Sequence, residues 1–182
     1  MADEEAVREL FDAAFLGDTF KLFSLIDADR SLIWEDTSGL TALHLAAWAG
    51  KKDALILLLD KGAEINATGE HGTALFAACL GGHMGIVEEL LAWGADPNVA
   101  ATNGETPLMA AAAKGLVDLA RRLLAAGADS GARTHSESGI LTDDPLPSAD
   151  VREVAIAAGH PEFLSLIEAS NPSPLRQDSG QA

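Results

Sequence analysis

The stretch TALHLAAWAG at residues 41–50 decides the fold, because it occurs three times. It recurs as TALFAACLGG (73–82) and TPLMAAAAKG (106–115). A second block follows in the same phase, as LLLDKGAEIN (57–66), ELLAWGADPN (89–98) and RLLAAGADSG (122–131). The opening threonines of the first block are 32 and 33 residues apart, and so are the glycines of the second. In-phase repetition of this length predicts a stack of supersecondary units.

Each pair of blocks predicts two short helices. The threonine that opens the first block is an N-cap residue, since its hydroxyl can accept a hydrogen bond from the first turn. In the third copy Pro107 follows, at a position where its missing N–H is harmless. Small apolar residues then form the first helix, and a Leu-rich second helix, such as 52–61, ends at a glycine suited to the left-handed conformation. The linking residues are rich in Asn, Gly, Asp and Thr and predict a turn or hairpin.

The repeated residues resemble the ankyrin-repeat family. The matching positions are Gly39, Thr41, Leu43, His44, Ala46, Ala47 and Gly50, and then Leu57, Leu58, Gly62, Ala63 and Asn66. The resemblance covers residues 36–133 closely. It implies an all-α solenoid of helix-turn-helix units with short β-hairpin loops, here with three full repeats at 36–68, 69–100 and 101–133.

The flanks match the pattern more weakly and predict caps. Residues 1–35 contain two helical stretches joined at Gly17, and residues 150–170 begin with a capping box of Asp150 and Glu153. A cap needs one apolar and one polar side. In the N-terminal cap we expect an inward set of Phe11, Ala14, Phe15, Leu22, Leu25 and Ile26, and an outward set of Glu4, Glu5, Arg8, Glu9 and Asp12. Residues 134–149 are an insertion, and residues 171–182 are expected to be a disordered tail.

Composition and charge exclude several classes of protein. The chain has 182 residues, 48% of them hydrophobic, and a formal charge of −16 that is concentrated at its two ends. This charge disfavours binding to nucleic acid or to an anionic membrane. The acidic N-terminus is unlike a secretory signal, so a cytoplasmic location is expected. The acidic ends either keep the chain in solution or steer a basic partner toward it.

Two residues of the deciding stretch have different expected roles. His44 is replaced by Phe76 and Met109 in the next copies, so a catalytic role is not expected. In the family, this histidine hydrogen-bonds the turn of a neighbouring repeat. Trp48 belongs to a column with Phe15, Leu80, Ala113 and Ala157, at a position that the family places on its concave, partner-binding face. Its alternative role is to pack against Phe15 over the cap.

The resemblance implies a protein-interaction module that is a monomer on its own. The expected contact positions are the concave face and the hairpin tips, namely Thr37, Ser38, Leu40, Trp48, Glu70, Gly72, Leu80, Thr102, Asn103, Glu105 and Lys114. Another protein is the expected partner, and the module would inhibit it or scaffold a complex. The competing hypothesis is an ankyrin frame with a ligand or catalytic site in the loop at 131–149.

Other chemistry finds little support in the sequence. His71, Cys79 and His83 suggest zinc, but Cys79 occupies a small-residue column with Ala47 and Ala112, and a structural site needs four ligands. Asp143 and Asp144 have no nucleophile motif beside them. We therefore expect no enzyme activity, no metal and no cofactor. Two further hypotheses are phosphorylation at Ser136 or Ser138, and hydroxylation at Asn66 or Asn98 in place of turn stabilisation.

Overall fold

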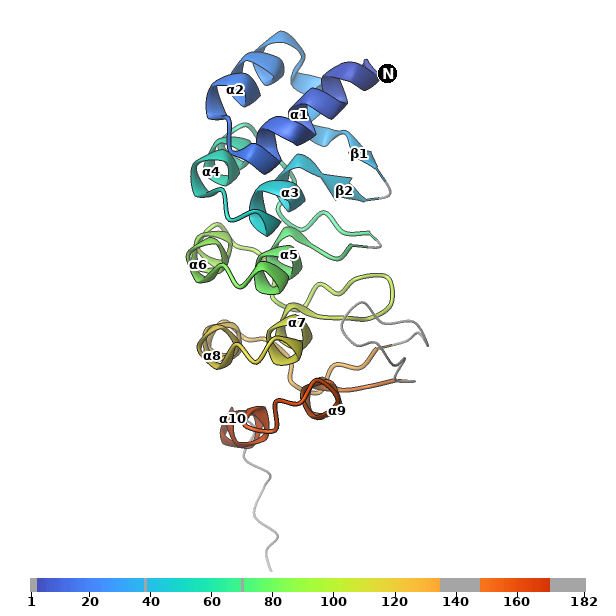
Figure 1. Cartoon of the computed structure of the whole chain (residues 1–182), viewed down its shortest axis with the longest axis vertical. Coiled ribbons are helices and arrows are strands. Elements are labelled where there is room, and N and C mark those ends of the chain that lie inside the picture. Colours follow the sequence, from blue (N-terminus) through green and yellow to red (C-terminus); the bar gives the residue numbers. More distant parts are fainter. Residues whose placement is uncertain (1–2, 38, 70, 135–147, 171–182) are drawn as a thin grey trace, which may run out of the picture.

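The computed structural model describes residues 3–37, 39–69, 71–134 and 148–170, and its helices form a vertical stack of pairs (Figure 1). The first helices of the pairs are α1 (Glu4–Leu16), α3 (Ala42–Trp48), α5 (Ala74–Gly81), α7 (Pro107–Ala113) and α9 (Val151–Ala157). The second helices are α2 (Thr19–Ala28), α4 (Lys52–Asp60), α6 (Met84–Ala92), α8 (Val117–Ala125) and α10 (Phe163–Ser170). A 3-10 helix, η1 (Arg30–Trp34), follows α2.

The expected ankyrin architecture is confirmed. First helices contact first helices along one row, second helices contact second helices along another, and the connecting segments lie on the far side of the first row (Figure 1). The predicted hairpin is present after η1, where β1 (Asp36–Thr37) pairs antiparallel with β2 (Leu40–Thr41). Gly69 and Gly72 form an isolated bridge at the equivalent place in the next repeat.

The threonine caps explain why the first helices begin where they do. The hydroxyl of Thr73 accepts a hydrogen bond from the N–H of Phe76 at 3.1 Å, and that of Thr106 accepts one from Met109 at 3.3 Å. Both N–H groups belong to a first turn, which has no partner of its own within the helix. The repeated threonine therefore sets the start of these helices.

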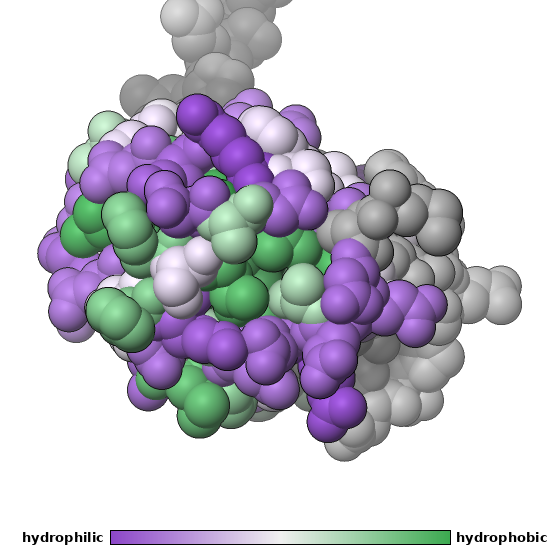
Figure 2. Space-filling model, turned by 90° about the horizontal axis from the view of Figure 1, so that it is seen from above, coloured by the Kyte–Doolittle hydropathy of each residue, from purple (hydrophilic) through white to green (hydrophobic). Residues whose placement is uncertain are grey.

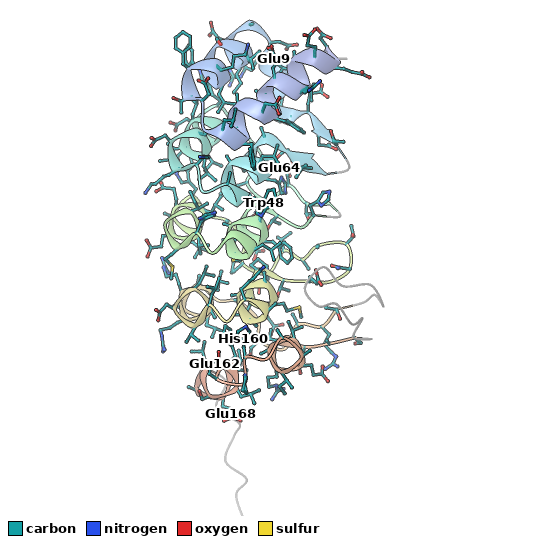
Figure 3. The ribbon with its side chains drawn as sticks, viewed as in Figure 1. Glu9, Trp48, Glu64, His160, Glu162 and Glu168 are labelled. Atoms are coloured by element: carbon teal, nitrogen blue, oxygen red, sulfur yellow. The ribbon has the colours of Figure 1, made fainter. Side chains whose placement is uncertain are left out.

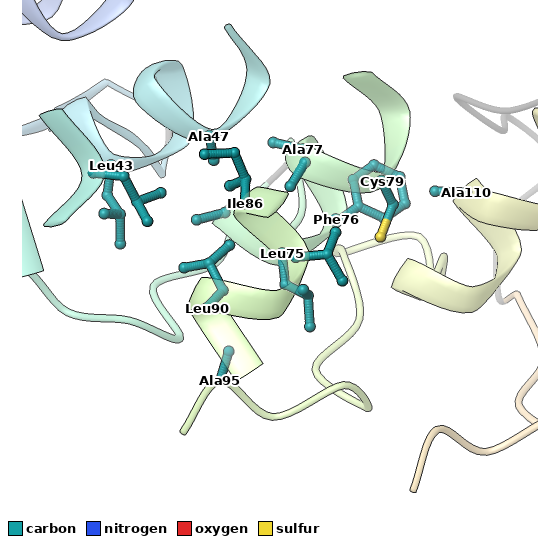
Figure 4. Packing of buried hydrophobic residues seen from close by; sticks show 14 of the residues in the cluster. Leu43, Ala47, Leu75, Phe76, Ala77, Cys79, Ile86, Leu90, Ala95 and Ala110 are labelled. Carbon is teal, nitrogen blue, oxygen red and sulfur yellow. The ribbon is translucent and has the colours of Figure 1, made fainter. Parts of the chain in front are cut away.

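The core runs through the stack as a continuous layer between the two rows. Its largest fully buried side chains include Leu43, Leu75 and Leu108 from one column, together with Phe76 and Phe163. Figure 4 shows how the small residues Ala47, Ala77 and Ala110 accompany the larger ones. Small side chains in the first row let neighbouring helices approach closely, so each repeat buries its face against the next.

Polar side chains also connect consecutive repeats. The Oδ1 atom of Asn66 accepts a hydrogen bond from the main-chain N–H of Asp96 at 3.0 Å, and Asn98 makes the same bond to Asp129 at 2.7 Å. The Thr68 hydroxyl donates to the carbonyl oxygen of Ala100 at 3.2 Å. These bonds give both asparagines the turn-stabilising contacts that were expected of them.

The N-terminal helix pair differs in part from the expectation. Gly17 closes α1 in the left-handed conformation, with φ 81°, and Ala14, Leu22 and Ile26 are buried. Phe15, which we expected to face inward, is instead 43% exposed, and its ring contacts that of Trp48 in the next repeat. Seen from this end, the stack shows apolar side chains surrounded by polar ones (Figure 2).

The flanks of the insertion are held together. The N–H of Thr134 donates to the carbonyl oxygen of Ala149 at 2.9 Å, and the N–H of Ala149 donates to the Thr134 hydroxyl at 2.8 Å. Arg133 forms an ion pair with Glu153 at 3.1 Å and donates to the carbonyl oxygen of Ser148. Glu153 also accepts a hydrogen bond from the N–H of Asp150, completing the predicted capping box. Residues 135–147 lie outside the described residues.

Candidate interaction surface

An apolar groove lies where α3 and α5 meet the hairpin segments. Its volume is about 340 Å³, and its lining consists of Leu40, His44, Leu45, Trp48, His71, Phe76, Ala77 and Leu80. We call these eight residues the apolar groove. A concave, mostly apolar surface with a few polar groups is typical of sites that bind ligands or side chains.

Trp48 lies between α3 and α5, where the first row of helices borders the groove (Figure 3). It ends α3 and is 53% exposed, although its ring also contacts Phe15, with 6.0 Å between the ring centroids and 46° between the planes. The two expected roles, packing over the cap and an exposed surface, are therefore combined in one residue. Phe15 supports the indole, and Trp48 lines the groove together with Leu80.

His44 forms part of the floor of the groove and has the structural contacts that were expected. It is 1% exposed, and its Nε2 atom lies 3.0 Å from the carbonyl oxygen of Gly72 in the next repeat. The main-chain N–H of Thr41 donates to Nδ1 at 3.2 Å, so Nδ1 is the acceptor and Nε2 carries the proton. Burial lowers the pKa of His44, which favours this neutral form.

The other expected contact residues differ in their exposure and in whether they line the groove. Leu40 and Leu80 are half-buried and line the groove. Four more are wholly or partly exposed on the hairpin tips or at the end of α7, namely Thr37, Thr102, Asn103 and Lys114. Ser38 and Glu70 lie outside the described residues.

Two expected contact residues are corrected by their burial. Gly72 is buried: its carbonyl accepts the His44 bond, and a Cβ added to it would lie only 2.7 Å from the Phe76 ring. Glu105 is only 2% exposed, since it directly precedes the buried cap residue Thr106. Neither residue presents a side chain at the surface, so we leave both out of the proposed contact set.

Of the eight groove residues, Leu40, Trp48 and Leu80 were predicted from the sequence as contact positions, and the other five, among them Leu45 and His71, were not. Leu45 follows His44 in the repeated block, but its column holds Ala77 and Ala110 in the next copies. Only the packing of neighbouring repeats in the structure shows that Leu45 lines the groove. His71 was weighed as a zinc ligand, and its position near the tip of a hairpin could have suggested a surface role.

The zinc hypothesis has no support from the described residues. Within these ranges no three His, Cys, Asp or Glu side chains come together in a way that could hold a metal ion. Cys79 is fully buried beside the core residues of Figure 4, and burial raises the pKa of its thiol.

Among the described residues, no helix combines the length and the apolar character that are needed to span a lipid bilayer.

Trp93 provides a useful contrast to Trp48. It follows α6 in the second row and is 43% exposed, and its Nε1 atom donates to Glu89 at 3.2 Å. Glu89 in turn pairs with Lys52 at 2.9 Å. Trp93 is thus a partly exposed residue outside the groove, with a polar partner of its own.

Comparison with known proteins agrees with this architecture. Two models of ankyrin repeats match the chain, one of three copies at residues 67–134 and one of many copies at residues 25–77. With the stacked helix pairs, these matches place the chain in the ankyrin-repeat family. Ankyrin repeats are in general modules that bind other proteins.

The relatives are diverse and longer than this chain. The B-cell lymphoma 3 protein homolog of Mus musculus is 36% identical over 139 residues, which cover 75% of this chain and 30% of that protein. The inactive serine/threonine-protein kinase TEX14 of Mus musculus is 40% identical over 98 residues, covering 53% of this chain and 7% of that protein. The probable E3 ubiquitin-protein ligase XBOS33 of Oryza sativa subsp. japonica is 38% identical over 120 residues, which cover 64% of this chain and 23% of that protein. This chain spans less than a third of each relative.

Proposed function

We propose that this chain is a non-catalytic interaction module that binds a partner protein through the apolar groove. Leu40, Trp48 and Leu80 supply apolar contact area, and the tips contribute Thr37, Thr102, Asn103 and Lys114. The observation that carries the proposal is the half-exposed Trp48 at the edge of a hollow of about 340 Å³. Tryptophan in such a position is enriched among the residues that dominate binding free energy.

The architecture supports this proposal through its rigidity. Trp48 is supported by Phe15 on one side, and its main-chain carbonyl is held by His83 at 2.9 Å. An anchor that is already held loses little conformational entropy on binding. The groove is therefore ready to receive a partner without rearrangement of its helices.

Photo-cross-linking tests the proposal. The photoreactive residue benzoylphenylalanine replaces Trp48 in one sample and Trp93 in another, and each is irradiated in an extract of the source cells. We expect position 48 to give discrete adducts that mass spectrometry identifies, and Leu80→Glu in the same chain to remove them. Position 93 is the matched control, since it carries the same residue type at similar exposure.

The outcome is decisive in both directions. The proposal is wrong if positions 48 and 93 give the same adducts, or if adducts from position 48 survive the Leu80→Glu change. Circular dichroism of each variant verifies that the helices are intact. Leu80 is only half-buried, and a charge at its site is expected to leave the fold in place.

A further inference from the structure

A second hollow adjoins the apolar groove on the side of α1. It has a volume of about 650 Å³ and is lined by residues of α1, by residues near β1 and by Leu45. Leu45 also lines the apolar groove. The two hollows therefore meet at one leucine, and a single extended segment that crosses Leu45 would contact both.

This second hollow is acidic. Its lining contains four carboxylates, those of Glu4, Asp12, Glu35 and Asp36, and one guanidinium, that of Arg8. In the described part of the chain, no Lys, Arg or His side chain forms an ion pair with any of these four residues. We call this lining the acidic hollow. Its uncompensated negative charge attracts cationic groups.

The apolar groove has the complementary character. Its floor includes Phe76, which is fully buried, and its edges include Leu80 and Trp48. The one cation among the expected contact residues, Lys114, ends α7, on the side of the groove away from α1. The surface thus changes from acidic at α1 to apolar at α3 and α5, and the exposed Lys114 follows at the end of α7.

Resting on the function proposed above, we infer that the occupant is an extended segment of a partner protein that places apolar side chains in the apolar groove and Lys or Arg side chains in the acidic hollow. Its basic end lies toward α1, because Lys114 repels it at the other side. Nucleic acid and anionic lipid have the wrong sign of charge for the acidic hollow. A purely apolar segment would leave its carboxylates without counter-charges.

Selection from a random peptide library displayed on phage tests this inference. The full chain is the immobilised target, and the Trp48→Ala/Leu80→Glu variant is used to remove peptides that bind elsewhere. We expect the enriched peptides to combine one or two large apolar residues with an adjacent group of Lys or Arg. Enriched peptides that are apolar without basic residues, or that are acidic, would overturn the inference.

Charge-neutralising variants then locate the basic residues of the selected peptide. The pair Glu4→Gln/Asp12→Asn removes two charges from the acidic hollow, and Glu88→Gln/Asp118→Asn removes two exposed charges from the second row. By fluorescence polarisation, we expect the first pair to weaken binding about tenfold, or about threefold for each charge. The control pair should change affinity less than twofold, and added salt should weaken binding to the unmodified chain.

The two proposals fail in different ways. If no peptide depends on Trp48 and Leu80, the proposed function and this inference both fail. We expect Trp48→Ala to weaken binding of the selected peptide by about thirtyfold or more, as the loss of an anchor residue should. If it does so, but the Glu4→Gln/Asp12→Asn pair changes the affinity no more than its control pair, the proposed function stands and the inference of a basic occupant is wrong.

Discussion

The Nε2 atom of His83 lies 2.9 Å from the main-chain carbonyl oxygen of Trp48, so the turn before α6 holds the end of α3. The same imidazole lies on Gly50, where a Cβ would be only 2.8 Å from the ring. His160 packs in the same way on Gly115, at 2.6 Å. In both places a histidine of one repeat packs on a glycine of the preceding repeat, and the His83 contact lies beside Trp48 of the groove.

This packing predicts that Gly50→Ala is more destabilising than Gly82→Ala. The two glycines have nearly the same positive φ, 69° and 70°, so the backbone strain of the substitution is matched. At Gly82 the nearest atom to an added Cβ is Leu116 Cδ1 at 3.6 Å, which is an ordinary contact. We expect Gly50→Ala to lower the free energy of unfolding by about 1–3 kcal/mol more than Gly82→Ala, measured in urea. Equal effects would show that the imidazole moves aside freely.

Replacing His44 should destabilise the chain although the next repeats tolerate apolar residues there. His44→Met keeps a side chain that the third repeat already uses at Met109, but it removes the bonds to Gly72 and Thr41. The Gly72 carbonyl then loses its side-chain donor. We expect a loss of about 1–3 kcal/mol at neutral pH, measured by urea denaturation. An unchanged midpoint would mean that water replaces the histidine.

The same residue predicts a pH dependence. Burial lowers the pKa of His44 below the value of 6.5 that it has in an unfolded chain. As the pH falls through 6.5, the unfolded state binds the proton before the folded state does, so stability falls. We expect the stability difference between the unmodified chain and His44→Met to shrink between pH 8 and pH 5. A constant difference over that range would contradict the lowered pKa.

Cys79 should react only when the chain unfolds. Its thiol is fully buried, and burial raises its pKa, so little thiolate is present to react. We expect Ellman's reagent to modify the native chain very slowly and the urea-unfolded chain at once. The control is Cys79→Ala, which carries the residue found at the equivalent positions Ala47 and Ala112 and gives the background signal of the reagent. Rapid modification of the native protein would contradict the prediction and would indicate local opening of α5.

Trp48→Ala should leave the stack folded. The side chain is half-exposed and its main intramolecular partner is the Phe15 ring, so we expect a loss of about 0.5–1.5 kcal/mol. Urea denaturation followed by circular dichroism measures it. Much larger destabilisation would assign Trp48 chiefly to packing over the cap and would weaken the proposed function.

The competing hypothesis of a site in the insertion has its own experiment. Thr134 and Ala149 are already hydrogen-bonded to each other, so replacing residues 135–147 by Asn-Gly should leave a three-residue loop, completed by Ser148, without loss of folding. Adducts from position 48 should persist in this variant. Their loss would instead support a functional role for the insertion, which stays a prediction of the sequence.

The architecture was predictable because its signals are local and repeated. The N-cap threonine, the apolar first helix and the glycine that closes the second helix are each recognisable within a few residues. Three copies of this pattern in phase strengthen the prediction of a repeat fold. The family resemblance indicated a surface position for the column of Trp48 and Leu80, and for Leu40 as a hairpin-tip residue. The burial of Gly72 and Glu105 was not predictable from the sequence. Whether a hairpin residue is exposed or buried depends on how the hairpin folds against the neighbouring repeat.

The sequence by itself determined the repeat period, the helix boundaries, the buried histidine and the family, since these depend on residue types at fixed spacing. Only the tertiary structure decided that Leu45 joins an apolar groove to an acidic hollow, and that Phe15 supports Trp48 from another repeat. Those features arise where side chains more than thirty residues apart in the chain converge. The packing of neighbouring helix pairs, which no single repeat encodes, sets which of these side chains meet.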